Sequence, residues 1–419
     1  MSRVGLVILC LAATACSSGW RFETGAVELT LPPGSGEPNL YATSAGAAVL
    51  TWHEPMDDGR SALRLAVRTD GTWSTPVTVT ERDNFFVNWA DFPSLVELND
   101  GTWVVQWLEK VASASYAYHV KLAMSRDRGA SWSAPIVPHR DDSPQEHGFV
   151  SMVALPDGGL ALVWLDGRNM AAAHGAAAGD MSIRTTTVGA DGSLGEEVLL
   201  DDRTCECCQT ALVQTPRGLV AAYRDRSPEE VRDIAIVRRV NGAWTEPVMV
   251  ADDYFVYPGC PVNGPQLAAT GDTVAIAWFA APEVDVGDVD SDDSESSNQT
   301  SGRRDAKVQV AFSPDGGATF GAPARVDLGD PLGRVEIETL PDGSALAVWV
   351  ERTEAAAAIL ARRVRPDGRM DAEWQVSPTA EARASGFPRM VRLGDEIVIA
   401  YRLVGDDGGV RVRTVRRAG

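Results

Sequence analysis

The residues with the most reactive side chains are four cysteines that stand just before predicted strands. Cys205, Cys207 and Cys208 fill three of four consecutive positions, and Cys260 precedes a later strand. Thiolate and imidazole ligands suit Cu(I) and Zn(II), so these cysteines with His147 predict a metal site. Outside the cytoplasm the cysteines would instead form disulfides, with Cys260 bonded to Cys205 or Cys207. Redox chemistry is a third alternative.

Arginines form the second group of chemically capable residues, in a chain whose formal net charge is −20. A guanidinium can bind a carboxylate through two parallel hydrogen bonds, so several guanidiniums together predict a site for an anionic ligand. Alternatively, they are structural partners of Asp166, Asp225 and Glu351 on neighbouring strands. The arginines that flank predicted strands are Arg168, Arg224, Arg226, Arg334, Arg389 and Arg402.

A sevenfold repeat of strands would position these side chains. In each unit a strand ends in an aromatic residue, and several of these strands follow an Asp-Gly turn that suits a tight hairpin. The seven segments are Ala48 to Trp52, Trp103 to Trp107, Leu160 to Trp164, Leu219 to Tyr223, Val274 to Trp278, Ala345 to Trp349 and Ile397 to Tyr401.

A second repeated signal is the turn Ser-x-Asp-x-Gly-x-Ser/Thr-aromatic, which is complete at Ser125–Trp132 and at Ser313–Phe320. Its Asp and Ser or Thr side chains bond backbone N–H groups across the turn, and Gly takes the left-handed conformation. The two signals interleave, so each unit contains four short antiparallel strands. This pattern predicts an all-β, seven-bladed β-propeller, with six blades as the alternative.

The predicted propeller is a single domain over residues 20–419, with an acidic loop insertion at 283–305. The last unit contains only three strands, ending at Val410–Arg416, whereas Ala26–Pro32 is a strand without a unit of its own. Pairing these two segments would close the ring and remove both exposed strand edges. We therefore expect the N-terminal strand to complete the last blade.

The turns and the unit layout resemble the Asp-box, or BNR, repeat superfamily that includes the sialidases. This resemblance implies a carboxylate clamp of Arg334 and Arg389 with Arg224 or Arg168. It also implies a nucleophilic tyrosine, an acidic partner for it, and an aspartate that acts as acid or base. The candidates for these three roles are Tyr257, Tyr223 or Tyr401; Glu146 or Glu206; and Asp91 or Asp141.

Ligand sites in propellers lie where the innermost strands begin, around the channel mouth. Residues just before or after the predicted strands should therefore form the rim of the site. The binding candidates found in this way, beside the cysteines and His147, are Glu37, Trp89, Asn263, Arg226 and Arg402.

Residues 1–15 are typical of an export leader, with Arg3, a short apolar run and Ala13-Thr14-Ala15 before Cys16. Cys16 would become the lipidated first residue of a lipoprotein anchored in the cell envelope, and ordinary secretion is the alternative. The acidic charge argues against binding to nucleic acid or directly to an anionic membrane. We expect a monomer that binds a glycan or a peptide.

Three classes of function are compatible with these features. The first is a sialidase-like propeller that recognises, and in the catalytic case hydrolyses, a glycan. The second is a non-catalytic envelope binding protein, which accounts for the absence of an Arg-Ile-Pro motif where Glu37-Pro38-Asn39-Leu40 opens the first unit. The third is an extracytoplasmic metal or redox protein centred on the Cys/His residues.

Overall fold

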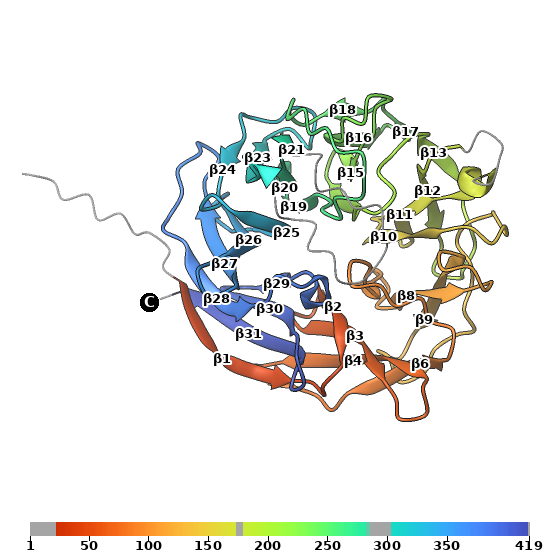
Figure 1. Cartoon of the computed structure of the whole chain (residues 1–419). Helices are drawn as coiled ribbons and strands as arrows, with labels where there is room; N and C mark the ends of the chain where they lie inside the picture. The colour runs from red at the N-terminus through yellow and green to blue at the C-terminus, as the bar shows by residue number, and fades with distance from the viewer. Residues whose placement is uncertain (1–21, 173–178, 282, 285–302, 418–419) are drawn as a thin grey trace, which may run out of the picture.

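The protein forms a ring of seven antiparallel blades, as the computed structural model shows for residues 22–172, 179–281, 283–284 and 303–417 (Figure 1). The predicted seven-bladed, all-β propeller is confirmed, and the six-bladed alternative is wrong. The predicted leader 1–15, Cys16, and most of the insertion 283–305 lie outside the described residues. Short strands β21 (Glu283–Val284) and β22 (Arg303–Arg304) pair at the base of that insertion.

The strands of each blade are numbered outward, and the first strand is the innermost. The first strands of blades 1 to 7 are β2 (Gly36–Ala42), β7 (Ser94–Glu97), β10 (His147–Ala154), β14 (Ala211–Thr215), β19 (Gln266–Thr270), β25 (Pro331–Thr339) and β29 (Arg389–Leu393). The second strands are β3 (Ala48–Pro55), β8 (Trp103–Lys110), β11 (Leu160–Asp166), β15 (Gly218–Arg224), β20 (Thr273–Ala280), β26 (Ala345–Arg352) and β30 (Glu396–Leu403).

The outer half of each blade is more irregular. The third strands are β4 (Ser61–Thr69), β9 (Tyr118–Ser125), β12 (Ser182–Val188), β16 (Ile234–Val240), β23 (Lys307–Ser313), β27 (Ala357–Val364) and β31 (Gly409–Arg417). The outermost strands are β5 (Thr72–Trp73) with β6 (Val77–Arg82), β13 (Val198–Asp201), β17 (Ala243–Trp244) with β18 (Val248–Met249), β24 (Ala324–Arg325), β28 (Trp374–Thr379) and β1 (Phe22–Thr30). In blade 2 a single bridge between Leu122 and Ile136 stands in place of the fourth strand.

The predicted closure of the ring is confirmed, because β1 pairs antiparallel with β31 from Phe22↔Arg417 to Thr30↔Arg411. The closing strand therefore starts before the predicted segment Ala26–Pro32. First strands of neighbouring blades contact one another in cyclic order, from β2 through β7, β10, β14, β19, β25 and β29 back to β2. Each blade consequently buries its faces against two neighbours.

The predicted aromatic at the end of each second strand is a buried core residue. Trp52, Trp107, Trp164, Trp278 and Trp349 are almost wholly excluded from solvent. Four of these indoles donate a hydrogen bond to the carboxylate two residues further on, as Trp349 Nε1 does to Glu351 at 2.6 Å. The acidic residues that follow these tryptophans are therefore structural partners of the indoles.

The strand order divides the ring into two faces. The turns between third and fourth strands lie at one end of every blade, and we call this end the Asp-box face. In the turn Ser125–Trp132, Asp127 accepts hydrogen bonds from the N–H and the hydroxyl of Ser131, and Ser125 Oγ accepts one from the Gly129 N–H. The opposite end, where chains pass from blade to blade, is called the loop face.

Candidate functional site

Two carboxyl groups and a tyrosine meet on the loop face between blades 2 and 3. The Tyr118 hydroxyl donates a hydrogen bond to Glu146 Oε1 at 2.6 Å, and a backbone bridge joins the same two residues. Asp91 accepts a hydrogen bond from the Phe149 N–H at 2.6 Å. A side chain at Gly148 would place its Cβ 2.6 Å from Asp91 Oδ2 and 3.2 Å from the Tyr118 hydroxyl, so glycine is needed there.

Burial alters the protonation of this cluster. Desolvation raises the pKa of Asp91 to about 7, against opposing hydrogen bonds from the backbone at Phe149 and Phe92. Desolvation likewise raises the pKa of Glu146 to about 7, although the Tyr118 hydrogen bond acts in the opposite direction. The pKa of Tyr118 is raised well above its usual value because the ring is fully buried. Glu146 and Asp91 can therefore exchange protons near neutral pH.

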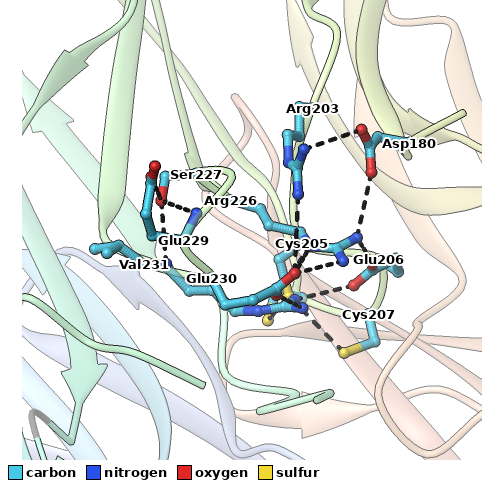
Figure 2. Close-up of polar contacts among 12 residues, drawn as sticks. Asp180, Arg203, Cys205, Glu206, Cys207, Arg226, Ser227, Glu229, Glu230 and Val231 are labelled. Carbon is cyan, nitrogen blue, oxygen red and sulfur yellow. Dashed lines mark hydrogen bonds and ion pairs between the residues drawn. The ribbon is translucent and has the colours of Figure 1, made fainter. Parts of the chain in front are cut away.

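A network of charges lies at blade 4 and involves Asp180, Arg203, Glu206, Arg226 and Glu230 (Figure 2). Glu206 accepts hydrogen bonds from Arg226 and from Arg232, the latter at 2.9 Å. Glu230 also bonds both arginines, and its pKa is lowered by these bonds although burial opposes them. Glu206 lies close enough to Glu146 for its charge to raise the pKa of Glu146. The carboxyl pair Glu146 and Glu206 thus joins the two groups of residues.

Three of the four cysteines expected to meet, Cys205, Cys207 and Cys208, have their sulfurs within 4.8 Å of one another. Cys205 Sγ lies 3.0 Å from Cys208 Sγ and 3.9 Å from Cys207 Sγ; Cys205 and Cys207 are labelled in Figure 2. Cys260 stands before the first strand of the next blade, outside this group, and its thiol adds to the raised pKa of Cys207, which burial raises most. Both Sγ–Sγ distances are longer than an S–S bond, and the four thiols are free. The expected disulfides are therefore not found among the described residues.

His147, which we expected beside the cysteines, lies in a different cluster. The Cys205, Cys207 and Cys208 sulfurs form one group within 4.8 Å, and nitrogens of His147, His119 and His139 form another. The His147 side chain is fully buried and faces Asp141 and Asp166. A shared Cys/His ion is therefore not supported by this arrangement.

The predicted arginine clamp does not assemble. Arg224 is buried and donates to the carbonyls of Asn263, Arg232 and Phe279. Arg168 pairs with Asp166 at 2.6 Å and with Glu197 at 2.8 Å. The Arg224 guanidinium bonds carbonyls of blades 4 and 5, and the Arg168 guanidinium bonds carboxylates of blade 3. Neither guanidinium is left to bind a ligand together with the other.

The other two arginines of the expected clamp are also engaged. Arg334 is buried, donates to Ser385 Oγ at 2.7 Å and lies over the Trp89 ring. Arg389 pairs with Glu336 at 3.0 Å. Desolvation lowers the pKa of Arg334 to about 10, and its buried hydrogen bonds are structural.

The remaining predicted rim residues have structural contacts as well. Arg402 forms an ion pair with Glu37 at 3.0 Å, and burial raises the pKa of Glu37 to about 7. Asn263 Oδ1 accepts a hydrogen bond from the Arg334 N–H at 2.6 Å. Tyr257 is buried and stacks on Phe255. The position of the expected nucleophile beside Glu146 is instead occupied by Tyr118, which sequence reasoning missed.

The Asp-box face carries hollows as well. One of about 430 Å³ lies between blades 3 and 4 and is lined by turns that include Asp157, Gln214, Arg217 and Arg239. Arg217 is already paired with Asp272 at 3.0 Å. This lining contains no buried carboxyl pair, so the loop face remains the candidate site.

Comparison with known proteins supports the fold. No family model matches the sequence, and no curated protein matches it either. The PL25 ulvan lyase, a polysaccharide lyase bound to -[GlcA(1-4)Rha3S]-, is 10% identical with a TM-score of 0.59, covering 93% of this chain and 95% of its own. This likeness supports the β-propeller fold.

Two further solved structures have the same overall arrangement. A protein of unknown function from Dyadobacter fermentans DSM 18053 is 14% identical with a TM-score of 0.52, covering 95% of this chain and 99% of its own. The alpha-L-arabinanase of Penicillium chrysogenum, complexed with arabinobiose, is 12% identical with a TM-score of 0.50, covering 94% and 98%. In the described part of the chain, no helix is long and apolar enough to cross a membrane.

Proposed function

We propose that this protein recognises a glycan on its loop face, between blades 2 and 4, and that Glu146 exchanges a proton with the bound sugar. The observation that carries the proposal is the cluster of Glu146, Asp91 and Tyr118, in which two carboxyl groups have pKa values near neutrality. Solved structures with this fold include a polysaccharide lyase, the ulvan lyase, and an alpha-L-arabinanase complexed with arabinobiose.

The two glutamates have different surroundings. Burial raises the pKa of Glu146, and its carboxyl accepts a hydrogen bond from the Tyr118 hydroxyl, so it suits a general acid. Glu206 accepts hydrogen bonds from the guanidiniums of Arg226 and Arg232. Glycoside hydrolysis uses one protonated and one ionised carboxyl group, and paired carboxyls with such different surroundings are suited to it. Tyr118, fully buried, acts as a positioning residue for Glu146.

We further propose that the ligand is a neutral glycan. A sugar carboxylate would need free guanidinium donors, but Arg224, Arg168, Arg334 and Arg389 all have partners within the protein. The sialic-acid specificity implied by the family resemblance therefore has no support in these residues.

A glycan array followed by calorimetry tests the proposal. The wild type should bind one class of neutral oligosaccharide, and Glu146→Gln should retain binding but reduce any hydrolysis by about 10²- to 10⁴-fold. The matched control is Glu354→Gln, which alters an exposed loop-face glutamate on blade 6 and should change neither property. Failure of every glycan to bind, or unchanged hydrolysis in Glu146→Gln, would reject the proposal.

A second candidate function is binding of a soft metal ion, and the convergence of the thiols favours it. Cys205, Cys207 and Cys208 offer sulfurs within 4.8 Å of one another. Ligands 2.3 Å from a tetrahedral ion lie about 3.8 Å apart, close to the 3.9 Å between Cys205 and Cys207. Burial raises the pKa of Cys205 to about 11, whereas hydrogen bonds from Cys205 and Cys207 and the charge of Arg224 hold the pKa of Cys208 well below its usual value against burial.

Competition with a Cu(I) chelator tests the thiol site. The reduced wild type should retain Cu(I), and Cys207→Ser should release it because the Cys207 and Cys205 sulfurs lie at ligand spacing, 3.9 Å apart. A free-thiol count on protein purified without reductant separates this proposal from disulfides, which would leave few or no free thiols. Loss of thiols with no Cu(I) binding after reduction would favour the structural disulfides.

We also propose that the protein is exported and anchored through Cys16. Arg3, the short apolar run and the small residues Ala13-Thr14-Ala15 before Cys16 support this location. Mass spectrometry of the mature N-terminus should find a lipidated Cys16, whereas an intact Met1 would contradict export.

A further inference from the structure

Three of the five histidines in the chain gather in one buried cluster outside the proposed glycan site. His119 belongs to β9 of blade 2, His147 begins β10 of blade 3, and His139 lies in the connection between them. All three side chains are buried, and one nitrogen of each lies within 4.8 Å of the others. The His139 and His147 rings stack at 4.0 Å, and His119 meets both edge-on.

Each ring has one nitrogen fixed on a backbone carbonyl. His119 Nε2 lies 2.8 Å from the Ser143 oxygen, His139 Nδ1 2.7 Å from that of Asp141, and His147 Nδ1 3.0 Å from that of Gln145. A carbonyl only accepts, so each of these nitrogens carries the proton. The second nitrogen of a neutral ring then presents a lone pair. Metal-binding histidines have this arrangement, with a carbonyl fixing the ring from behind.

The lone pairs on His139 and His147 are poorly satisfied by protein groups. Among the described residues, Nε2 of His139 and Nε2 of His147 are buried without a hydrogen-bond partner. His147 Nε2 also lies 3.1 Å from Asp141 Oδ2 and 3.6 Å from Asp166 Oδ2. Two acceptors at such a distance repel each other unless a cation or a proton lies between them.

We propose that His119, His139 and His147 bind a divalent transition-metal ion of the Zn²⁺ class, and that the Asp141 carboxylate, which lies outside the group of three nitrogens but 3.1 Å from His147 Nε2, moves in as the fourth ligand. Donors 2.0–2.1 Å from a tetrahedral ion lie about 3.3 Å apart, so the 3.1 Å between His147 and Asp141 already approaches ligand spacing. Asp166 is not used as a ligand because Trp164 Nε1 and Arg168 occupy its oxygens. Four protein ligands in a buried position make the site structural.

The ion would tie blade 2 to blade 3 directly behind the carboxyl cluster. Tyr118 and Glu146 are the chain neighbours of His119 and His147, and alternation along the strands turns each pair to opposite sides. The site does not depend on the glycan proposal, because none of its ligands belongs to the cluster of Glu146, Asp91 and Tyr118. It is also separate from the thiols, which prefer softer ions.

Equilibrium dialysis with Zn²⁺ and zinc-edge X-ray absorption test this site in the full chain. The wild type should bind an ion with a nitrogen and oxygen shell at about 2.0–2.1 Å, whereas binding at the thiols would give sulfur at about 2.3 Å. His139→Gln should weaken that binding at least 100-fold. His53→Gln is the matched control, since His53 is another buried histidine outside the cluster.

The outcome is decided by two further observations. If His139→Gln fails to fold, Asp141→Asn provides a second test. Asp141→Asn should fold, because the side chain is partly exposed and its replacement is mild, and it should weaken Zn²⁺ binding. Zn²⁺ should also raise the melting temperature of the wild type and of Cys207→Ser equally. A sulfur-only shell in the wild type, or unchanged affinity in both His139→Gln and Asp141→Asn, would overturn the assignment.

Discussion

Replacement of Arg224 by methionine should destabilise the protein without affecting ligand recognition. The guanidinium donates to three buried carbonyls: Asn263 at 3.0 and 2.6 Å, Arg232 at 2.5 Å and Phe279 at 2.7 Å. It thereby joins blade 4 to blade 5. Methionine fills similar volume but donates no hydrogen bond, so three acceptors lose their partner.

The magnitude follows from those three carbonyls. A buried acceptor without a partner costs about 1–3 kcal/mol, and water entry offsets part of that cost, so we expect a loss of about 3–5 kcal/mol. Urea unfolding should show a lower midpoint at an unchanged slope. Arg217→Met is the control, because this arginine is half exposed in its pair with Asp272 and should cost less than about 1 kcal/mol. A loss below 1 kcal/mol for Arg224→Met, or loss of glycan binding by the folded variant, would refute a structural role.

Three other predictions follow from the fold. The pKa of Asp91 is about 7 in the folded protein and 3.8 in the unfolded chain. The protonated Asp91 carboxyl therefore stabilises the fold fully below pH 3.8, and this stabilisation is lost as the pH rises through 7. Urea unfolding should show that the stability of Asp91→Asn increases relative to that of the wild type as the pH rises from about 4 to about 8. Deleting β1 should expose the edge of β31, lower the melting temperature and cause aggregation, as light scattering can detect. Glu351→Leu should leave the Trp349 indole without its acceptor and cost about 1–3 kcal/mol by urea unfolding.

Much of the fold could be predicted because its signals are local. A buried tryptophan such as Trp164 and an Asp-Gly turn such as Asp157-Gly158 recur in register with the blades, so counting them counts the sheets. The closing strand was also predictable, since a blade without an outer strand needs one. The convergence of Cys207 and Cys260 followed from the adjacency of two blades.

The site was harder to predict because side-chain direction is decided by packing between blades. Arg334 precedes a first strand in the sequence, where we expected a ligand contact, yet its guanidinium donates to Ser385 Oγ. Tyr118 meets Glu146 through a parallel bridge that no strand pattern indicates. The histidine cluster combines a strand residue, His119, with a loop residue, His139, so no spacing in the sequence signals it.

The pairing of β1 with β31 has a mechanical consequence. Because Phe22 and Arg417 are opposite each other, a load applied between the two chain ends acts across the ladder and not along it. The hydrogen bonds would then break one pair at a time, starting at Phe22, which is the unzipping geometry. In the shear geometry they would have to break together. Irregular register between Thr24 and Leu29 weakens the ladder near its start. Single-molecule pulling on both ends should therefore open the ring at low force before any blade unfolds.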